Sequence, residues 1–147
     1  MPPAPLASAK LTDLAGDLRV ALTLAVRRIR LERSDDTISD GQYAVLAHLA
    51  NHGPLTPSRL ADLEHVQPPP MTRTVNCLVD AGLVAREQHP TDGRQVLVRL
   101  TDAGMAEVTE TRRRRNAWLA GRLAELPPDE REVLTRATEI LRRITTT

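Results

Sequence analysis

Aromatic side chains are almost absent from this 147-residue sequence, which holds one Trp, one Tyr and no Phe. The interior must therefore be built from Leu, Val, Ile and Ala, residues that are commonly buried and that suit helical packing. Proteins that bind single-stranded nucleic acid without sequence preference stack its bases on aromatic side chains. The composition argues against that mode of binding.

Cysteine is equally scarce. Cys77 is the only one, so no disulfide within the chain is possible and a reducing cytoplasm is the expected location. The first ten residues lack the apolar core of a signal peptide, and no segment approaches the roughly 20 apolar residues of a membrane span. The sequence also lacks a Gly-rich phosphate loop, a metal motif and a nucleophile elbow. We therefore expect an unexported cytoplasmic protein that is not an enzyme, needs no cofactor and has no membrane partner.

The most informative stretch runs from Thr56 to Leu100 and reads as two short helices followed by two strands. Thr56 is a suitable N-cap, and Pro57 suits the first position of a helix. The triple proline at residues 68–70 cannot lie inside a helix but can lead into one. Hydrophobic residues then recur at helical spacing, at Met71, Val75, Leu78 and Val79. The pattern predicts a second helix that follows the prolines and packs on the core through this stripe.

The opposite face of this second helix carries small polar groups and one basic side chain: Thr72, Arg73, Asn76, Cys77 and Asp80. In a helix-turn-helix the second helix enters a DNA major groove about 12 Å wide, which favours such side chains. A solvent-facing helix surface would show the same pattern. The helix alone therefore leaves both interpretations open.

Two strands are predicted directly after this helix. Ala81-Gly82 ends the helix, because Gly can adopt the left-handed conformation of a C-cap. Residues 83–86 then form one strand, and the alternating pattern at residues 96–100 forms its partner. The sequence between them, HPTDGRQ, is a turn in which Pro and Asp-Gly supply the special backbone angles of a hairpin tip. A helix-turn-helix followed at once by a β-hairpin is a winged helix.

The run from Gly82 to Gly104, GLVAREQHPTDGRQVLVRLTDAG, resembles the MarR family of transcription regulators. Its most specific part is the D-x-R of the wing, Asp92-Gly93-Arg94, followed by L-T-x-x-G at residues 100–104. The T-R of the recognition helix is present as Thr72-Arg73. The resemblance is strong from Leu55 to Gly104, and the lengths of the flanking segments fit over nearly the whole chain.

The resemblance implies a mainly α fold with a small β-hairpin wing, in one domain. The winged helix-turn-helix is expected at residues 38–100, with N- and C-terminal dimerisation helices at residues 9–33 and 102–147. Leu and other apolar residues recur every three or four positions in these terminal segments, as in amphipathic helices. Residues 1–8 are rich in Pro and Ala and are expected to be disordered or to wrap on a partner. The four arginines at residues 112–115 have two interpretations, a nucleic-acid arm or a solvent-facing surface paired with carboxylates such as Glu107 and Glu110.

The resemblance further implies a sequence-specific regulator, a repressor that binds a pseudo-palindromic double-stranded operator as a homodimer. We expect Thr72, Arg73 and Asn76 to face base edges, with Arg73 on guanine and Asn76 on adenine. Arg94 is expected to reach from the wing toward the minor groove, while Asp92 and Gly93 shape the tip. The expected phosphate contacts are Arg59, Gln67, Thr74 and Arg86. A small aromatic or anionic effector would bind in a cleft near the first helix, Tyr43, Val45 and the fifth helix.

Net charge is the feature that fits DNA binding least. Ser39–Leu100 carries five arginines against six carboxylates, a net charge of −1, whereas phosphate binding needs clustered positive charge. The triple proline also removes three backbone N–H groups that could hold a phosphate. DNA binding must then depend on a few placed arginines and on the doubled site of a dimer. The alternative is a winged helix that contacts proteins without binding DNA.

Two smaller features have a functional and a structural interpretation. His48 and His52 lie one helical turn apart and could ligate a metal together with Asp62, Glu64 or His65. Such a pair is also typical of a helix C-terminus, where the dipole favours positive charge, and we predict no metal site. Cys77 could sense oxidants or serve as a small spacer on the recognition helix.

Overall fold

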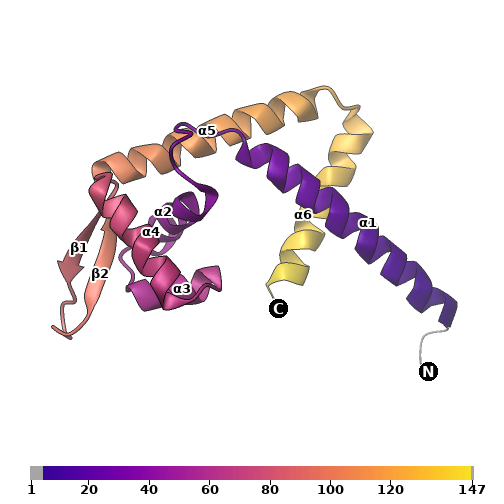
Figure 1. Ribbon diagram of the computed structural model, residues 1–147. Coiled ribbons are helices and arrows are strands. Elements are labelled where there is room, and N and C mark those ends of the chain that lie inside the picture. The colour runs from indigo at the N-terminus through magenta and orange to yellow at the C-terminus, as the bar shows by residue number, and fades with distance from the viewer. Residues whose placement is uncertain (1–4, 147) are drawn as a thin grey trace. The chain divides into compact units, whose positions relative to one another are not determined.

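The computed structural model describes the backbone of residues 5–146 and the side chains of residues 9–146. It is mainly helical with one two-stranded antiparallel sheet (Figure 1), which confirms the predicted fold class. The elements are, in chain order, α1 Pro5–Arg30, α2 Asp40–His52, α3 Pro57–Glu64, α4 Pro68–Asp80, β1 Val84–Gln88, β2 Val96–Leu100, α5 Asp102–Ala124 and α6 Pro128–Thr145. They form two compact units. Unit 1 holds the residues up to Leu31 and from Arg115 onward, and unit 2 spans Glu32–Arg114.

The first helix of unit 2 begins with the only capping box that the structure describes. The Ser39 hydroxyl accepts the Gln42 N–H at 3.1 Å, and the Gln42 side-chain oxygen accepts the Ser39 N–H at 2.9 Å. Both N–H groups would otherwise lack a partner at the helix start. α2 ends at His52, where Gly53 has φ 77° and donates its N–H to Leu49. The sequence pattern therefore fixes both ends of α2.

The core of unit 2 lies between α2, α3, α4 and the hairpin. It is aliphatic, as the composition predicts. Its fully buried hydrophobic side chains are Val45, Leu46, Leu60, Val75, Leu78, Val98 and Val108. Met71 is also buried and Val79 is half-buried, so the stripe predicted for the second helix faces this core. α4 is thereby held with its polar face outward.

A close junction joins the end of α4 to the start of α5. Gly82 has φ 74°, and the Thr101 hydroxyl donates to the Gly82 carbonyl at 2.6 Å while it accepts the Gly104 N–H at 3.1 Å. The Thr101 N–H donates to the Leu83 carbonyl at 3.1 Å. Gly104 packs so closely against Leu83 that no side chain fits there. Through these contacts, residues of the L-T-x-x-G motif hold the start of α5 against the segment between α4 and β1.

Two boundaries differ from the predictions. α1 spans Pro5–Arg30 instead of residues 9–33, because residues 31–39 form turns. Of the eight residues expected to be disordered, residues 5–8 are helical, and residues 1–4 lie outside the described part of the chain. No helix in the described part is both long enough and apolar enough to cross a bilayer.

Unit 1 contains α1, the second half of α5, and α6. Inside it the Trp118 ring faces the guanidinium groups of Arg28, 4.3 Å from the ring centroid, and of Arg122, at 5.7 Å. Such cation–π contacts stabilise modestly at partly exposed sites. The helices nevertheless leave their apolar stripes uncovered within one chain. The most exposed large hydrophobic side chains here are Leu11, Leu14, Leu31, Val133 and Ile144, each at least 61% exposed.

Candidate nucleic-acid interface

α4 begins with its three prolines. The structure places Pro68, Pro69 and Pro70 as the first turn of the helix, after Gln67 as the N-cap. The first backbone N–H of α4 is therefore that of Met71, and it already donates to the Gln67 carbonyl at 3.4 Å. A helix start usually offers several N–H groups to a phosphate, but this one offers none. Contacts with DNA at this end depend on side chains.

The polar face of α4 carries Thr72, Arg73 and Asn76, all exposed, with Thr74 half-buried. The Thr72 hydroxyl donates to the Pro68 carbonyl and the Thr74 hydroxyl to the Pro70 carbonyl, each at 3.1 Å. A phosphate oxygen only accepts hydrogen bonds, so Thr74 would have to give up its helical bond to contact one. This geometry makes Thr74 a poor phosphate ligand. Thr72 keeps an oxygen lone pair and a methyl group for a base edge.

Asn76 and Arg86 meet although they come from different elements. The Arg86 guanidinium, from β1, donates a hydrogen bond to the side-chain oxygen of Asn76 on α4. Arg86 pairs with Val98 across the hairpin, so the strand position is fixed by the sheet. The contact links the wing to the recognition helix. Sequence reasoning assigned the two residues separate roles and missed their contact, since they lie 10 residues apart in different elements.

The wing tip is held by side-chain acceptors. The strands pair from Val84 with Leu100 to Gln88 with Val96, and residues 89–95 form the loop. The imidazole Nδ1 of His89 accepts the Thr91 N–H at 3.2 Å and the Asp92 N–H at 3.1 Å. The Asp92 carboxylate accepts the Arg94 N–H at 3.1 Å. Asp92 thus shapes the tip through the backbone of Arg94, as a residue that supports the wing would.

The special backbone angle expected of the glycine in Asp92-Gly93 is not found. Gly93 does not adopt a positive φ. Among the described glycines, only Gly53 and Gly82 do. The loop is longer than a two-residue turn, and His89 and Asp92 accept the N–H groups that a tight turn would satisfy internally. The spacing of His89-Pro-Thr-Asp92 could have indicated this loop, because a polar side chain can accept the backbone N–H groups two and three residues after it.

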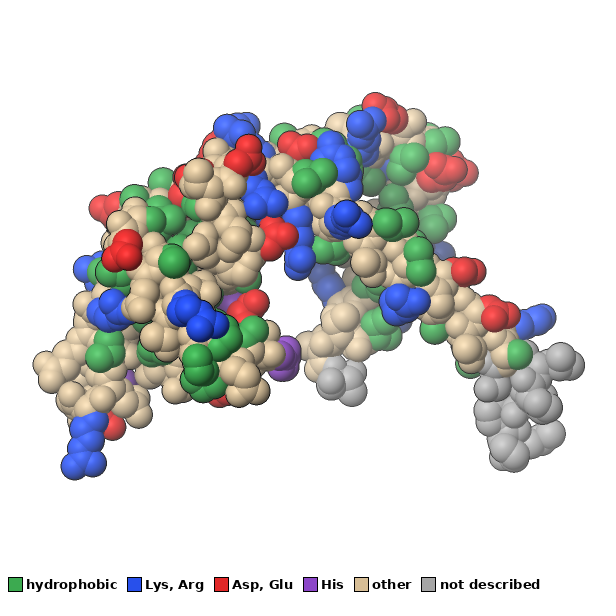
Figure 2. Space-filling model, viewed as in Figure 1, with side chains coloured by type: hydrophobic (Ala, Val, Ile, Leu, Met, Phe, Trp, Pro, Cys, Tyr) green, Lys and Arg blue, Asp and Glu red, His purple; other side chains and the backbone are tan. Residues whose placement is uncertain are grey.

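Arg94 is exposed and lies near the start of α3. Thr56, Pro57 and Ser58 of that helix line a cavity of about 300 Å³ together with Arg94, Gln95 and Val96. Arg59, one turn into α3, is exposed as well. Figure 2 shows a basic side chain projecting at the far end of the hairpin, the segment that contains Arg94.

Charge pairing within the winged helix leaves most of its arginines without an ion-pair partner. Three of the carboxylates are engaged: Asp40 with Arg33 at 3.3 Å, Glu64 with His48 at 2.5 Å and Glu87 with Arg99 at 3.3 Å. Among the described residues no ion pair involves the other four arginines of the winged helix, namely Arg59, Arg73, Arg86 and Arg94. These four arginines come from α3, α4, β1 and the wing loop. Positive charge is therefore available on the elements that would approach DNA.

Comparison with known proteins agrees with this geometry. Residues 38–96 match the profile of the MarR family. The uncharacterized HTH-type transcriptional regulator ML2140 of Mycobacterium leprae is 42% identical over 128 residues, which cover 87% of this chain and 90% of that protein. This chain belongs to the MarR family. It is therefore a DNA-binding transcription regulator, and MarR proteins are regulators rather than enzymes.

Other MarR-family relatives extend the match along the chain. The HTH-type transcriptional repressor MdtR of Bacillus subtilis is 30% identical over 122 residues, 80% of this chain and 79% of its own length. A MarR family protein from Bacillus stearothermophilus superposes with a TM-score of 0.81 at 25% identity, covering 95% of this chain and 98% of its own. The likeness extends beyond the winged helix and includes the terminal helices.

The structure also places the histidine pair, Cys77 and the arginine run of this MarR-family protein. His48 stacks on His52 with the ring centroids 6.1 Å apart and pairs with Glu64, and no three metal-binding side chains converge in the described residues. Cys77 is exposed on α4. Arg113 and Arg114 both bond Glu110, which confirms the surface pairing expected for the arginine run. Glu107, the other carboxylate considered for that run, accepts a hydrogen bond from Ser34 instead.

Proposed function

We propose that this MarR-family chain is a cytoplasmic repressor that binds a pseudo-palindromic duplex as a homodimer. The observation that carries the proposal is the set of four winged-helix arginines, Arg59, Arg73, Arg86 and Arg94, that form no ion pair among the described residues. Arginines without an ion-pair partner can neutralise DNA phosphates. The counterions that the DNA then releases favour binding. The relative MdtR is named a repressor, which supports repression rather than activation.

Dimerisation is supported by the apolar stripes of unit 1. Leu11 and Leu14 on α1 are 63% and 61% exposed, and Val133 and Ile144 on α6 are 65% and 61% exposed. Apolar surface left in water costs about 25 cal/mol per Å², and a self-complementary helical interface removes that cost. Two recognition helices held by such an interface would fit major grooves about 34 Å apart.

The residue roles follow from the site. Arg73 reads a guanine edge and Thr72 contacts a neighbouring base through its methyl group. Arg94, whose backbone N–H is held by the Asp92 carboxylate, enters the minor groove. Arg59, Gln67 and Arg86 approach phosphates. Thr74 is the weakest of the assigned contacts, because its hydroxyl proton is used within α4.

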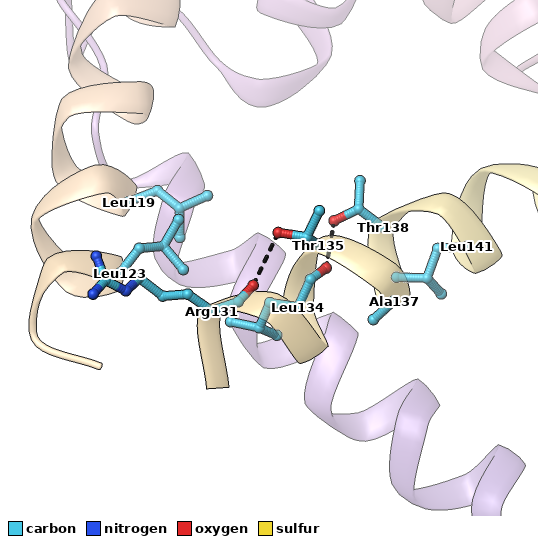
Figure 3. A pocket seen from close by; sticks show the side chains of 8 residues that line it. All are labelled: Leu119, Leu123, Arg131, Leu134, Thr135, Ala137, Thr138 and Leu141. Carbon is cyan, nitrogen blue, oxygen red and sulfur yellow. Dashed lines mark hydrogen bonds between the residues drawn. The ribbon is translucent and has the colours of Figure 1, made fainter. Parts of the chain in front are cut away.

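A small aromatic or anionic effector would release the protein from DNA. Of the residues expected to line its cleft, Val45 is buried in the core of unit 2 and Tyr43 is half-buried. A cavity of about 440 Å³ in unit 1 has the size of a small-molecule site. Figure 3 shows Leu119 and Leu123 of α5 on one side and residues of α6 on the other, with Arg131 extending toward Leu123. An apolar cavity with one guanidinium suits an aromatic anion.

Binding tests the proposal directly. DNase footprinting of the protein on DNA upstream of its own gene should protect two half-sites, and the affinity should fall steeply with salt. A winged helix used only for protein contact would protect nothing and show no salt dependence.

Light scattering tests the dimer. The parent chain should have the mass of a dimer, and Ile140→Glu, on the apolar face of α6, should give monomers because it buries a charge in the interface. Arg142→Glu places a charge on the polar face of the same helix and should remain dimeric. A parent chain that is monomeric would contradict the proposal.

A further inference from the structure

We propose that Arg86 sets which base Asn76 reads, so that the pair selects guanine in the major groove instead of adenine. The inference rests on the proposed function, because it concerns how α4 recognises duplex DNA. It corrects the sequence-based expectation that Asn76 reads adenine. The observation that carries it is the hydrogen bond from Arg86 to Asn76.

The chemistry of the two side chains fixes the orientation of the amide. A guanidinium has five N–H donors and no acceptor, whereas an Asn amide has one oxygen acceptor and one NH₂ donor group. The Asn76 atom that faces Arg86 must therefore be the oxygen. The NH₂ group of Asn76 keeps both of its donors for DNA, and Asn76 is exposed on the outer face of α4.

Adenine recognition by Asn uses both ends of the amide. The oxygen accepts from the N6 amino group, and the NH₂ group donates to N7. Arg86 uses one of the two lone pairs of the Asn76 oxygen, and its donor-only guanidinium lies beside that oxygen, so an amino group of the base must compete with Arg86 for this acceptor. Guanine presents two adjacent acceptors, N7 and O6, in the major groove. The NH₂ group of Asn76 can donate to those acceptors without competition, whereas the N6 amino group of adenine would have to share the Asn76 oxygen with Arg86.

The hairpin fixes the backbone position of Arg86 beside α4. Arg86 lies on β1, where it pairs with Val98 of β2, and Val98 is fully buried in the core of unit 2. Among the described residues no carboxylate competes for its guanidinium. Arg99, on the neighbouring strand, is different: its guanidinium pairs with Glu87 at 3.3 Å. Arg86 is thus a positioning residue, and Arg99 offers a matched control on the same hairpin.

The test is in vitro selection from a randomised duplex library with the full-length chain, at one salt concentration. The position read by Asn76 is identified as the one whose base preference is lost in Asn76→Ala. The parent chain should select guanine there. Arg86→Met frees the Asn76 oxygen and should shift that single position to adenine, with a change in relative affinity of roughly tenfold, typical of one bidentate contact.

Three further variants make the result decisive. Arg86→Lys keeps a donor-only partner and should retain guanine, and Arg99→Met should leave the whole profile unchanged. Asn76→Asp exposes an acceptor in place of the NH₂ group and should shift the position toward cytosine, whose amino group donates. If Arg86→Met fails to fold, the base that the parent chain selects at this position still tests the inference.

Two results would overturn the inference: adenine selected at this position by the parent chain, or a guanine preference that Arg86→Met leaves unchanged. A parent chain that enriches no sequence at all would overturn the proposed function itself. The two failures are therefore distinguishable.

Discussion

The carbonyl oxygen of Leu83 lies 2.0 Å from the point where a Cβ on Gly104 would stand. Real Cβ atoms essentially never come that close to a backbone oxygen, so the first turn of α5 would have to move away from β1. We expect Gly104→Ala to lower the free energy of unfolding by about 1–3 kcal/mol, the cost of overpacking. Urea unfolding followed by circular dichroism measures this change in the free energy of unfolding.

Gly121→Ala is the control for this prediction. Gly121 lies on the same helix with nothing within 4 Å of its ideal Cβ. Because Ala favours a helix over Gly by about 1 kcal/mol, this variant should be slightly more stable than the parent chain. Equal stability of the two variants would mean that the contact with Leu83 is not tight.

Arg94→Ala should weaken binding to every DNA sequence, because a wing arginine contributes mainly through charge. The expected loss is about 1–3 kcal/mol, together with a salt dependence smaller by roughly one counterion. Fluorescence anisotropy across a salt series measures both. Arg99→Ala removes an arginine from the same hairpin that is already paired with Glu87, and it should have little effect.

Arg73→Ala should lower affinity and also blur sequence preference. Arg73 is exposed on the outer face of α4, where a bidentate contact with guanine contributes about 1–3 kcal/mol of discrimination. The measurement is the ratio of affinities for the footprinted site and for unrelated DNA. A ratio equal to that of the parent chain would place Arg73 outside the base-reading surface.

His89→Ala should loosen the wing tip without unfolding unit 2. The variant leaves the N–H groups of Thr91 and Asp92 without their imidazole acceptor, so the loop loses its fixed shape and DNA affinity falls several-fold. NMR relaxation of residues 89–95 reports the loop directly. His52→Ala, which removes an exposed histidine from α2, should change neither quantity.

Glu110 should titrate far below an ordinary glutamate. Hydrogen bonds from Arg113 and then from Arg114 lower the pKa of Glu110 from 4.5 to about 2. A carboxyl whose pKa is lowered on folding stabilises the folded state above its ordinary pKa, and this contribution is lost as the pH falls from 4.5 toward 2. Carboxyl NMR resonances recorded over that range give the pKa.

Removing both arginines, in Arg113→Ala/Arg114→Ala, should return the pKa of Glu110 toward 4.5. Arg112 donates to Asn51 at 2.8 Å instead, so Arg112→Ala should leave the pKa low. Titration of Glu110 near 4.5 in the parent chain would show that these contacts do not persist in solution.

Local patterns predicted the helices and the hairpin well. The stripe through Met71, Val75 and Leu78 faces the core because helical periodicity fixes which side chains share a face. The capping box at Ser39 needs only residues three positions apart. The L-T-x-x-G motif was visible as a pattern, but the need for Gly104 arises from its contact with Leu83, which only the fold brings near.

The contacts that the sequence did not predict either join separate elements or stabilise a loop where a tight glycine turn was expected. Asn76 and Arg86 were each assigned to DNA, and nothing in a one-dimensional pattern indicates that a strand residue engages a helix residue. Asp-Gly predicted a glycine with unusual angles, yet His89 and Asp92 stabilise the longer loop through side-chain acceptors. Such choices depend on loop geometry that composition does not determine.

The three prolines that open α4 have a consequence for how the regulator meets its operator. Each proline ring holds φ near −65°, so the first turn of the recognition helix has few alternative conformations even before the complex forms. Ordering a backbone residue costs about 1–2 kcal/mol of conformational entropy, and here much of that cost falls on folding instead of on association. The helix meets DNA with a preorganised leading end.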